Sequence, residues 1–137
     1  MELSKNFSLE ELCQSDTADR LGIDNTPKDK EVMENLKALT KEILQPLRNF
    51  ARRAVVVNSG YRCPEVNKAV GGVANSQHLT GEAADLRLKS IEEGREWVAW
   101  IKANRNFDQL IIERNKKGAV WLHVSYKRKG RNRRQAF

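Results

Sequence analysis

Cysteine and histidine are both scarce in this chain of 137 residues, with two of each. Two cysteines, Cys13 and Cys63, are too few for a disulfide framework, and they do not stand at the spacing of a zinc finger. We therefore expect two unpaired thiols, with a bridge or a reactive thiol as the alternatives that stay open.

Long apolar runs are missing as well. No run approaches the roughly 20 residues that a membrane-spanning helix needs, so we expect no membrane insertion. The sequence MELSKNFSLEEL has no basic stretch followed by an apolar one, as a secretory signal would. We expect synthesis in the cytoplasm, with a phage-type route as a means of release to a cell wall or periplasm.

The composition is typical of one globular domain. Hydrophobic residues make up 39% of the chain and charged residues 31%. A chain of this length is long enough for a single domain with its own core. There is no internal repeat and no linker, and we expect a monomer.

Positive charge gathers at the C-terminal end. The formal net charge is +7, and residues 127–134 are rich in lysine and arginine. Such a segment predicts attraction to a polyanion, either nucleic acid or an anionic cell wall, and a solvated, disordered tail is an equal alternative. No aromatic residues interleave with the charges to stack on bases, which disfavours nucleic acid. We divide the chain into a domain, 1–126, and a basic tail, 127–137.

The first part of the chain predicts helices. Ser8 and Glu11 form a capping-box pattern that opens a short helix. Residues 26–53 carry apolar residues every three or four positions, which gives one apolar face suited to cover a sheet. Thr26 and Pro27 fit the cap and first turn of this helix, and Pro46 predicts a kink or break.

The second part predicts strands with one crossover helix. Residues 54–60 form a short β-branched run, and residues 82–89 alternate between apolar and polar. Ser90 and Glu93 suggest a second capping box at the start of a helix. Residues 107–126 predict a hairpin; a loop at 116–118 would place Glu113 opposite Trp121 and on the face of His123. The whole predicts an α+β fold in which helices cover an antiparallel sheet.

Both histidines lie in distinctive settings. His78 and Asp85 belong to SQHLTGEAADL, and His123 belongs to VWLHVSY on the predicted hairpin. A loop that enters a strand can aim His78 and Asp85 at one point, with Gly81 for the turn and Ala83 leaving room. Two imidazoles and one carboxylate, with a fourth position open to water, are typical of a catalytic zinc site. On spacing alone the pattern is weak, since a lone histidine is usually an ordinary core or surface residue.

Three blocks in order, SGYRCPEVN, SQHLTGEAADL and WLHVSY, resemble the zinc D-Ala-D-Ala carboxypeptidases and related murein peptidases of the hedgehog/DD-peptidase fold. The resemblance extends to about Tyr126 and is greatest to compact, phage-type members. It implies Zn²⁺ as cofactor and His78, Asp85 and His123 as its ligands. It implies cleavage of a peptide bond in peptidoglycan stem peptides, by a carboxypeptidase or an endopeptidase such as a phage lytic enzyme.

The resemblance also implies two residues that act on the substrate. Arg62 corresponds to the arginine over the substrate, and its planar guanidinium suits a peptide carboxylate. Many relatives carry an acid three positions before the last histidine ligand, where this chain has Val120. We therefore assign the general base to Glu113 across the hairpin, with Glu82 as a fallback. Ser76 is a candidate to bond a ligand or the peptide.

Three alternatives to a zinc peptidase remain open from the sequence. The first is a zinc-binding domain of the same fold without turnover, which the loss of the acid at Val120 keeps open. The second is a thiol peptidase, which would need Cys63 close to His78 or His123. The third is a nucleic-acid-binding protein that uses the basic tail.

Overall fold

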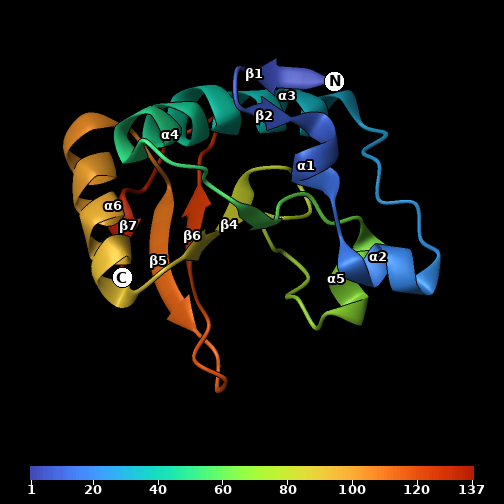
Figure 1. Ribbon diagram of the computed structural model, residues 1–137. Helices are drawn as coiled ribbons and strands as arrows, with labels where there is room; N and C mark the ends of the chain where they lie inside the picture. Colours follow the sequence, from blue (N-terminus) through green and yellow to red (C-terminus); the bar gives the residue numbers. More distant parts are fainter.

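The computed structural model describes residues 1–137, and it places helices around a five-stranded sheet (Figure 1). The helices are α1 (Leu9–Cys13), α2 (Asp16–Leu21), α3 (Lys30–Leu39), the π-helical turn η1 (Thr40–Leu44), α4 (Gln45–Ala51), α5 (Pro64–Ala69) and α6 (Ile91–Asn104). The strands are β1 (Glu2–Ser4), β2 (Phe7–Ser8), β3 (Val57–Ser59), β4 (Ala83–Leu88), β5 (Gln109–Arg114), β6 (Val120–Ser125) and β7 (Gln135–Ala136).

The main sheet has the strand order β3-β4-β6-β5-β7, and its first four strands pair antiparallel. This confirms the α+β class and the antiparallel sheet. The last strand, β7, differs because it pairs parallel to β5 at the edge. The predicted hairpin register is confirmed: Glu113 faces Trp121, and Asn115 closes the loop by bonding to Ala119.

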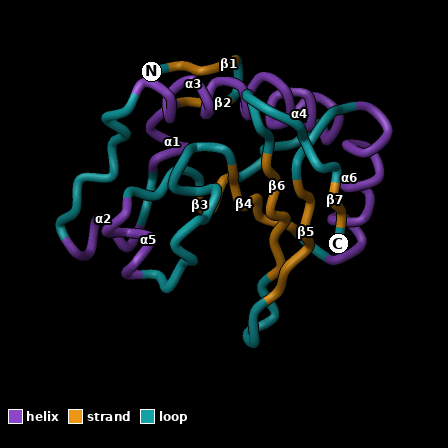
Figure 2. Tube along the Cα trace, turned by 180° about the vertical axis from the view of Figure 1, so that it is seen from behind, coloured by secondary structure: helices purple, strands orange, loops and turns teal.

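Strand alternation separates a core face of the sheet from a polar face. Ala84, Leu86, Leu122 and Val124 are fully buried and belong to the hydrophobic core, together with the apolar faces of α3 and α6. Because successive side chains in a strand point to opposite faces, Asp85 and His123 lie on the other side, directly opposite each other in neighbouring strands. Figure 2 shows β4, β6 and β5 side by side, with α6 beyond β5. Packing of the core face therefore fixes the positions of Asp85 and His123 on the polar face of the sheet.

The long predicted helix differs in two places. It begins at Lys30 with Asp29 as its cap, so the assignment of Thr26 and Pro27 to its start was wrong. The break expected at Pro46 appears as the π-helical turn η1 just before it. Proline has no N–H to donate to the carbonyl of Glu42, and that carbonyl instead accepts a hydrogen bond of 2.7 Å from Arg105 Nε.

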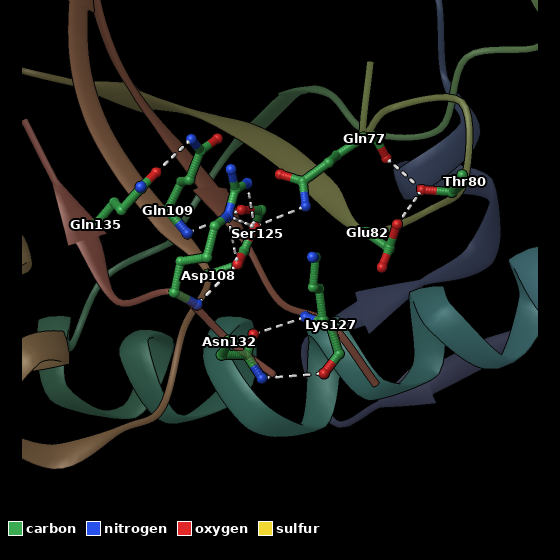
Figure 3. A network of polar contacts seen from close by, with 10 residues as sticks. Gln77, Thr80, Glu82, Asp108, Gln109, Ser125, Lys127, Asn132 and Gln135 are labelled. Carbon is green, nitrogen blue, oxygen red and sulfur yellow. Dashed lines mark hydrogen bonds and ion pairs between the residues drawn. The ribbon is translucent and has the colours of Figure 1, made fainter. Parts of the chain in front are cut away.

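The basic segment 127–137 returns to the domain rather than leaving it. Asn132 and Lys127 exchange two hydrogen bonds (Figure 3). Arg133 pairs with Asp108. Arg128 and Lys129 both pair with Glu31 next to the start of α3. The free, solvated tail considered from the sequence does not describe this segment.

None of the helices combines the length and the apolar character that crossing a membrane would require.

Candidate metal centre and its pocket

The loop that carries His78 is built from short turns. The Ser76 hydroxyl accepts a hydrogen bond of 3.2 Å from the backbone N–H of His78. Gly81 then takes a left-handed conformation with φ of +77°, and a Cβ there would lie 2.8 Å from the carbonyl oxygen of Val32 in α3. Only glycine meets both demands without strain, so the loop packs closely on α3 before it enters β4.

The structure brings the three predicted ligands together. Asp85 Oδ1 lies 3.4 Å from His78 Nε2 and 3.0 Å from His123 Nδ1. One donor atom from each of the three residues can be chosen so that all lie within 4.8 Å of one another. The two imidazoles stand edge to face, with ring centres 5.3 Å apart. Side chains from a loop and from two paired strands therefore converge on one point.

The backbone fixes the orientation of the His78 ring. Its Nδ1 lies 2.7 Å from the carbonyl oxygen of Gly60. A carbonyl can only accept, so Nδ1 donates to Gly60, and Nε2 is the ring nitrogen that faces Asp85. Gly60 itself is tightly placed, because a Cβ there would come 2.3 Å from the carbonyl oxygen of Leu12. A second polar group that orients a ligand histidine in this way is characteristic of metal sites.

Asp85 is held in its charged form. Burial opposes the charge, but hydrogen bonds from His123 and His78 outweigh burial and hold the pKa of Asp85 well below its usual range. The carboxylate is thus a ready anionic donor beside two imidazole nitrogens.

This donor set fits zinc. Ligand atoms at about 2.0–2.2 Å from a tetrahedral Zn²⁺ stand roughly 3.3 Å from one another. The two distances measured from Asp85 bracket that value. Two imidazoles and one carboxylate leave a fourth position for water, which separates this arrangement from a closed structural site.

Arg62 approaches the same carboxylate from another direction. Its Nη2 lies 3.7 Å from Asp85 Oδ2, while Nε donates to Ser59 and Nη1 to Asn67. Burial lowers the pKa of Arg62, and the negative charges of Asp85 and Glu113 oppose that effect. Most of the arginine's donors are already engaged, and its side chain is only 17% exposed.

Glu113 lies on the wall of a pocket of about 340 Å³ that also includes His123 and Ser76. Its carboxylate forms no hydrogen bond or ion pair in the chain, whereas Glu82 accepts a hydrogen bond from Thr80 (Figure 3). Val120 pairs with Arg114 next to the loop of the hairpin. Of the two acids considered from the sequence, Glu113 is the one that shares a pocket with a candidate ligand.

The thiols are separate from the centre. Both cysteines are free, and Cys63 is a buried core residue whose sulfur makes no hydrogen bond to either histidine. Burial, and to a lesser degree Glu10, raises the pKa of Cys13 to about 11. The geometry therefore gives no support to a thiol nucleophile.

The sequence did not reveal a polar network beside the centre. Asp108 is fully buried, and its carboxylate accepts from Gln77 Nε2 at 2.9 Å (Figure 3). The same carboxylate accepts from Arg133. Gln77 precedes His78 in the chain, and Gln77, Gln109 and Arg133 line the same pocket as His123. Neither Asp108 nor Arg133 stands in a motif, so no local signal marked them.

Comparisons with known proteins agree with this geometry. Residues 5–125 match the family model described as Peptidase M15. The chain is also similar to a zinc D-Ala-D-Ala carboxypeptidase from Streptomyces albus G, with 35% identity over 69 residues. That match covers 50% of this chain and 26% of the relative, so the chain spans only about a quarter of the curated protein it matches.

Proposed function

The chain belongs to the peptidase M15 family, and from that premise we propose that it is a zinc peptidase that hydrolyses a peptide bond in peptidoglycan stem peptides. The convergence of His78, Asp85 and His123 on one point carries this proposal. The likeness to a zinc D-Ala-D-Ala carboxypeptidase supports both the metal and the class of substrate.

His78 would hold the metal through Nε2 and His123 through Nδ1, since these are the nitrogens that face Asp85. A zinc ion bound there polarises a carbonyl oxygen and lowers the pKa of a coordinated water toward about 7. The hydrogen bond from His78 Nδ1 to Gly60 keeps that ring from turning away.

Glu113 is the general base in this proposal. Its carboxylate shares a pocket with His123 and has no partner in the chain, so it is free to accept a proton from the attacking water. The same carboxyl group then delivers the proton to the leaving amine as the peptide bond breaks. This role compensates for Val120, which cannot take a proton.

Arg62 holds the substrate in this proposal, and Ser76 supports the loop that carries His78. The proposed substrate bond is either that of a C-terminal residue or one in a cross-bridge. A phage lytic enzyme is the setting that we propose, because the three sequence blocks resemble those of phage-type members of this group.

The test is digestion of purified sacculi by the zinc-loaded protein, with the released fragments identified by mass. Glu113→Gln should lower the rate by about 10²- to 10⁴-fold, the usual contribution of a general base. Glu96→Gln serves as the matched control because Glu96 is exposed on α6, and it should leave the rate unchanged.

Zinc content is measured on the same samples. If the protein binds stoichiometric zinc but neither the wild type nor any variant hydrolyses sacculi, the proposed peptidase activity is wrong. The chain is then a zinc-binding domain that does not hydrolyse its ligand. Equal rates for the wild type and Glu113→Gln would remove Glu113 from the mechanism and leave the peptidase in place.

A further inference from the structure

The guanidinium group of Arg133 is hydrogen-bonded to Asp108 through two of its nitrogens, and its third nitrogen has no partner. Its Nε donates to both carboxylate oxygens of Asp108, at 3.0 and 3.2 Å, and Nη2 donates to Oδ2 at 2.6 Å. The backbone N–H of Arg133 donates to the same carboxylate at 2.9 Å. The remaining nitrogen, Nη1, has no hydrogen-bond partner in the chain, and the side chain is 44% exposed.

The anchor itself is rigid. Asp108 is fully buried, and it also accepts from Gln77 and, through its own N–H, bonds to Ser125 at the end of β6. Burial opposes the charge of Asp108, but the hydrogen bonds from Arg133 and Gln77 prevail and lower the pKa of Asp108 to about 2. A guanidinium fixed by several charge-assisted bonds loses little further freedom when it binds a ligand.

The anchored arginine belongs to the pocket of the candidate metal centre. Arg133, Gln109, Glu113 and His123 all line that pocket. Arg62 does not line this pocket. Its guanidinium donors already face Asp85, Ser59 and Asn67. Arg133 is therefore the cation of this pocket that still has unpaired donors.

We propose that Arg133 is a specificity-determining residue that binds a carboxylate of the peptide substrate through Nη1. The inference rests on the proposed peptide substrate, and it assigns a binding role to the segment after residue 125, where the family match ends. A stem peptide with lysine as its third residue offers two such carboxylates, one at its C-terminus and one on its glutamate residue. Both present the same chemistry to a guanidinium.

Three synthetic stem peptides distinguish these sources. One carries both free carboxylates, the second is amidated at the C-terminus, and the third has the glutamate carboxylate amidated. Turnover is measured as kcat/KM with the zinc-loaded protein. Binding of the same peptides is measured by calorimetry with zinc-loaded Glu113→Gln, so that affinity is read without cleavage.

The variants are chosen to avoid an uncompensated buried charge. Replacing Arg133 alone would leave Asp108 buried without its cation, which is strongly destabilising. The test variant is therefore the neutral pair Arg133→Gln/Asp108→Asn, which removes the cation and the buried charge together. Asp108→Asn alone changes the network but keeps the cation, and Arg131→Gln removes an exposed charge from the same segment.

The wild type should prefer the free peptide over one of the two amides by roughly tenfold, as expected for a partly exposed charge-assisted hydrogen bond. That preference should fall to about one in the double variant. It should weaken without disappearing in Asp108→Asn, which keeps the cation but loses its charged anchor, and it should persist in Arg131→Gln. The amide that loses binding identifies the carboxylate. An unchanged preference in the double variant, or no discrimination by the wild type, overturns the inference.

The two proposals can fail separately. Binding with the expected preference but no hydrolysis by the wild type would retain Arg133 as a recognition residue and remove the peptidase. Hydrolysis by the wild type with a preference that is unchanged in the double variant would retain the peptidase and overturn the role of Arg133. Absence of binding to all three peptides would overturn the role of Arg133.

Discussion

Asp108 has partners from two distant parts of the chain, with Gln77 on one side and Arg133 on the other. Its pKa of about 2 lies below the value of about 3.9 expected in an unfolded chain. A carboxyl group whose pKa is depressed by folding stabilises the protein above its unfolded pKa. That contribution is lost as the pH falls through the folded pKa.

We predict that Asp108→Asn destabilises the protein at pH 7 and that the difference from the wild type shrinks in acid. The contribution of the ionised carboxylate is about 2.6 kcal/mol at most and is lost progressively between roughly pH 5 and pH 1. Urea unfolding of both proteins with a chelator present, at pH 7 and at pH 2.5, measures the difference. A difference that stays constant between the two pH values would contradict the assigned cause.

The three candidate ligands were predictable from the sequence, whereas Arg133 was not. Two histidines in a chain of this length, each within a recognisable block, limit the candidates to His78 and His123. Arg133 stands among similar basic residues, and charge alone does not tell which one meets a buried carboxylate. That information depends on Asp108, which is 25 positions away.

At the scale of elements, alternation was a reliable signal, and capping residues were reliable at Ser8, where the predicted capping box is fully formed, but not at Thr26. In β4 the pattern placed Leu86 and Asp85 on opposite faces, as the structure has them. The start of α3 was wrong because both Thr26 and Asp29 are good cap residues, and only Asp29 accepts from an N–H of the helix. Near Thr26 the Asp24 side chain accepts instead, which makes a turn.

The start of α6 shows how tertiary partners alter a local motif. Ser90 accepts from the N–H of Glu93, as a capping box requires. Glu93 does not bond back to Ser90; its carboxylate accepts from the N–H of Lys89 and from Arg53. The predicted second capping box is therefore only half formed.

We predict that Ser90→Ala lowers the free energy of unfolding by about 1 kcal/mol, the usual cost of a lost N-cap. The matched control is Glu92→Ala, an exposed position in the same turn, which should change stability by less than about 0.5 kcal/mol. Urea unfolding monitored by circular dichroism gives both values. Similar losses for the two variants would argue against a capping role for Ser90.

At the scale of the whole molecule, the candidate centre joins segments that are distant in the sequence. His78 lies in the loop after α5, Asp85 in β4 and His123 in β6, and the C-terminal segment closes the pocket beside them. Sequence blocks could indicate that these segments meet. They could not show that residues 127–137 return to the sheet, because β7 has only two residues and its pairing with β5 is long-range.

A ligand that binds only the folded arrangement stabilises it, so zinc should raise the free energy of unfolding of the wild type. The gain is about 2.7 kcal/mol when free zinc is one hundred times its dissociation constant. Asp85→Asn removes the anionic donor shared by the two imidazoles, and we expect it to lose most of this gain. Glu65→Gln, an exposed position in α5, should keep it. Thermal unfolding of the three proteins across a zinc series, each referred to its own chelated sample, separates metal binding from any effect of the substitution on the metal-free fold. An equal zinc-dependent gain in Asp85→Asn would mean that the stabilising ion binds elsewhere on the chain.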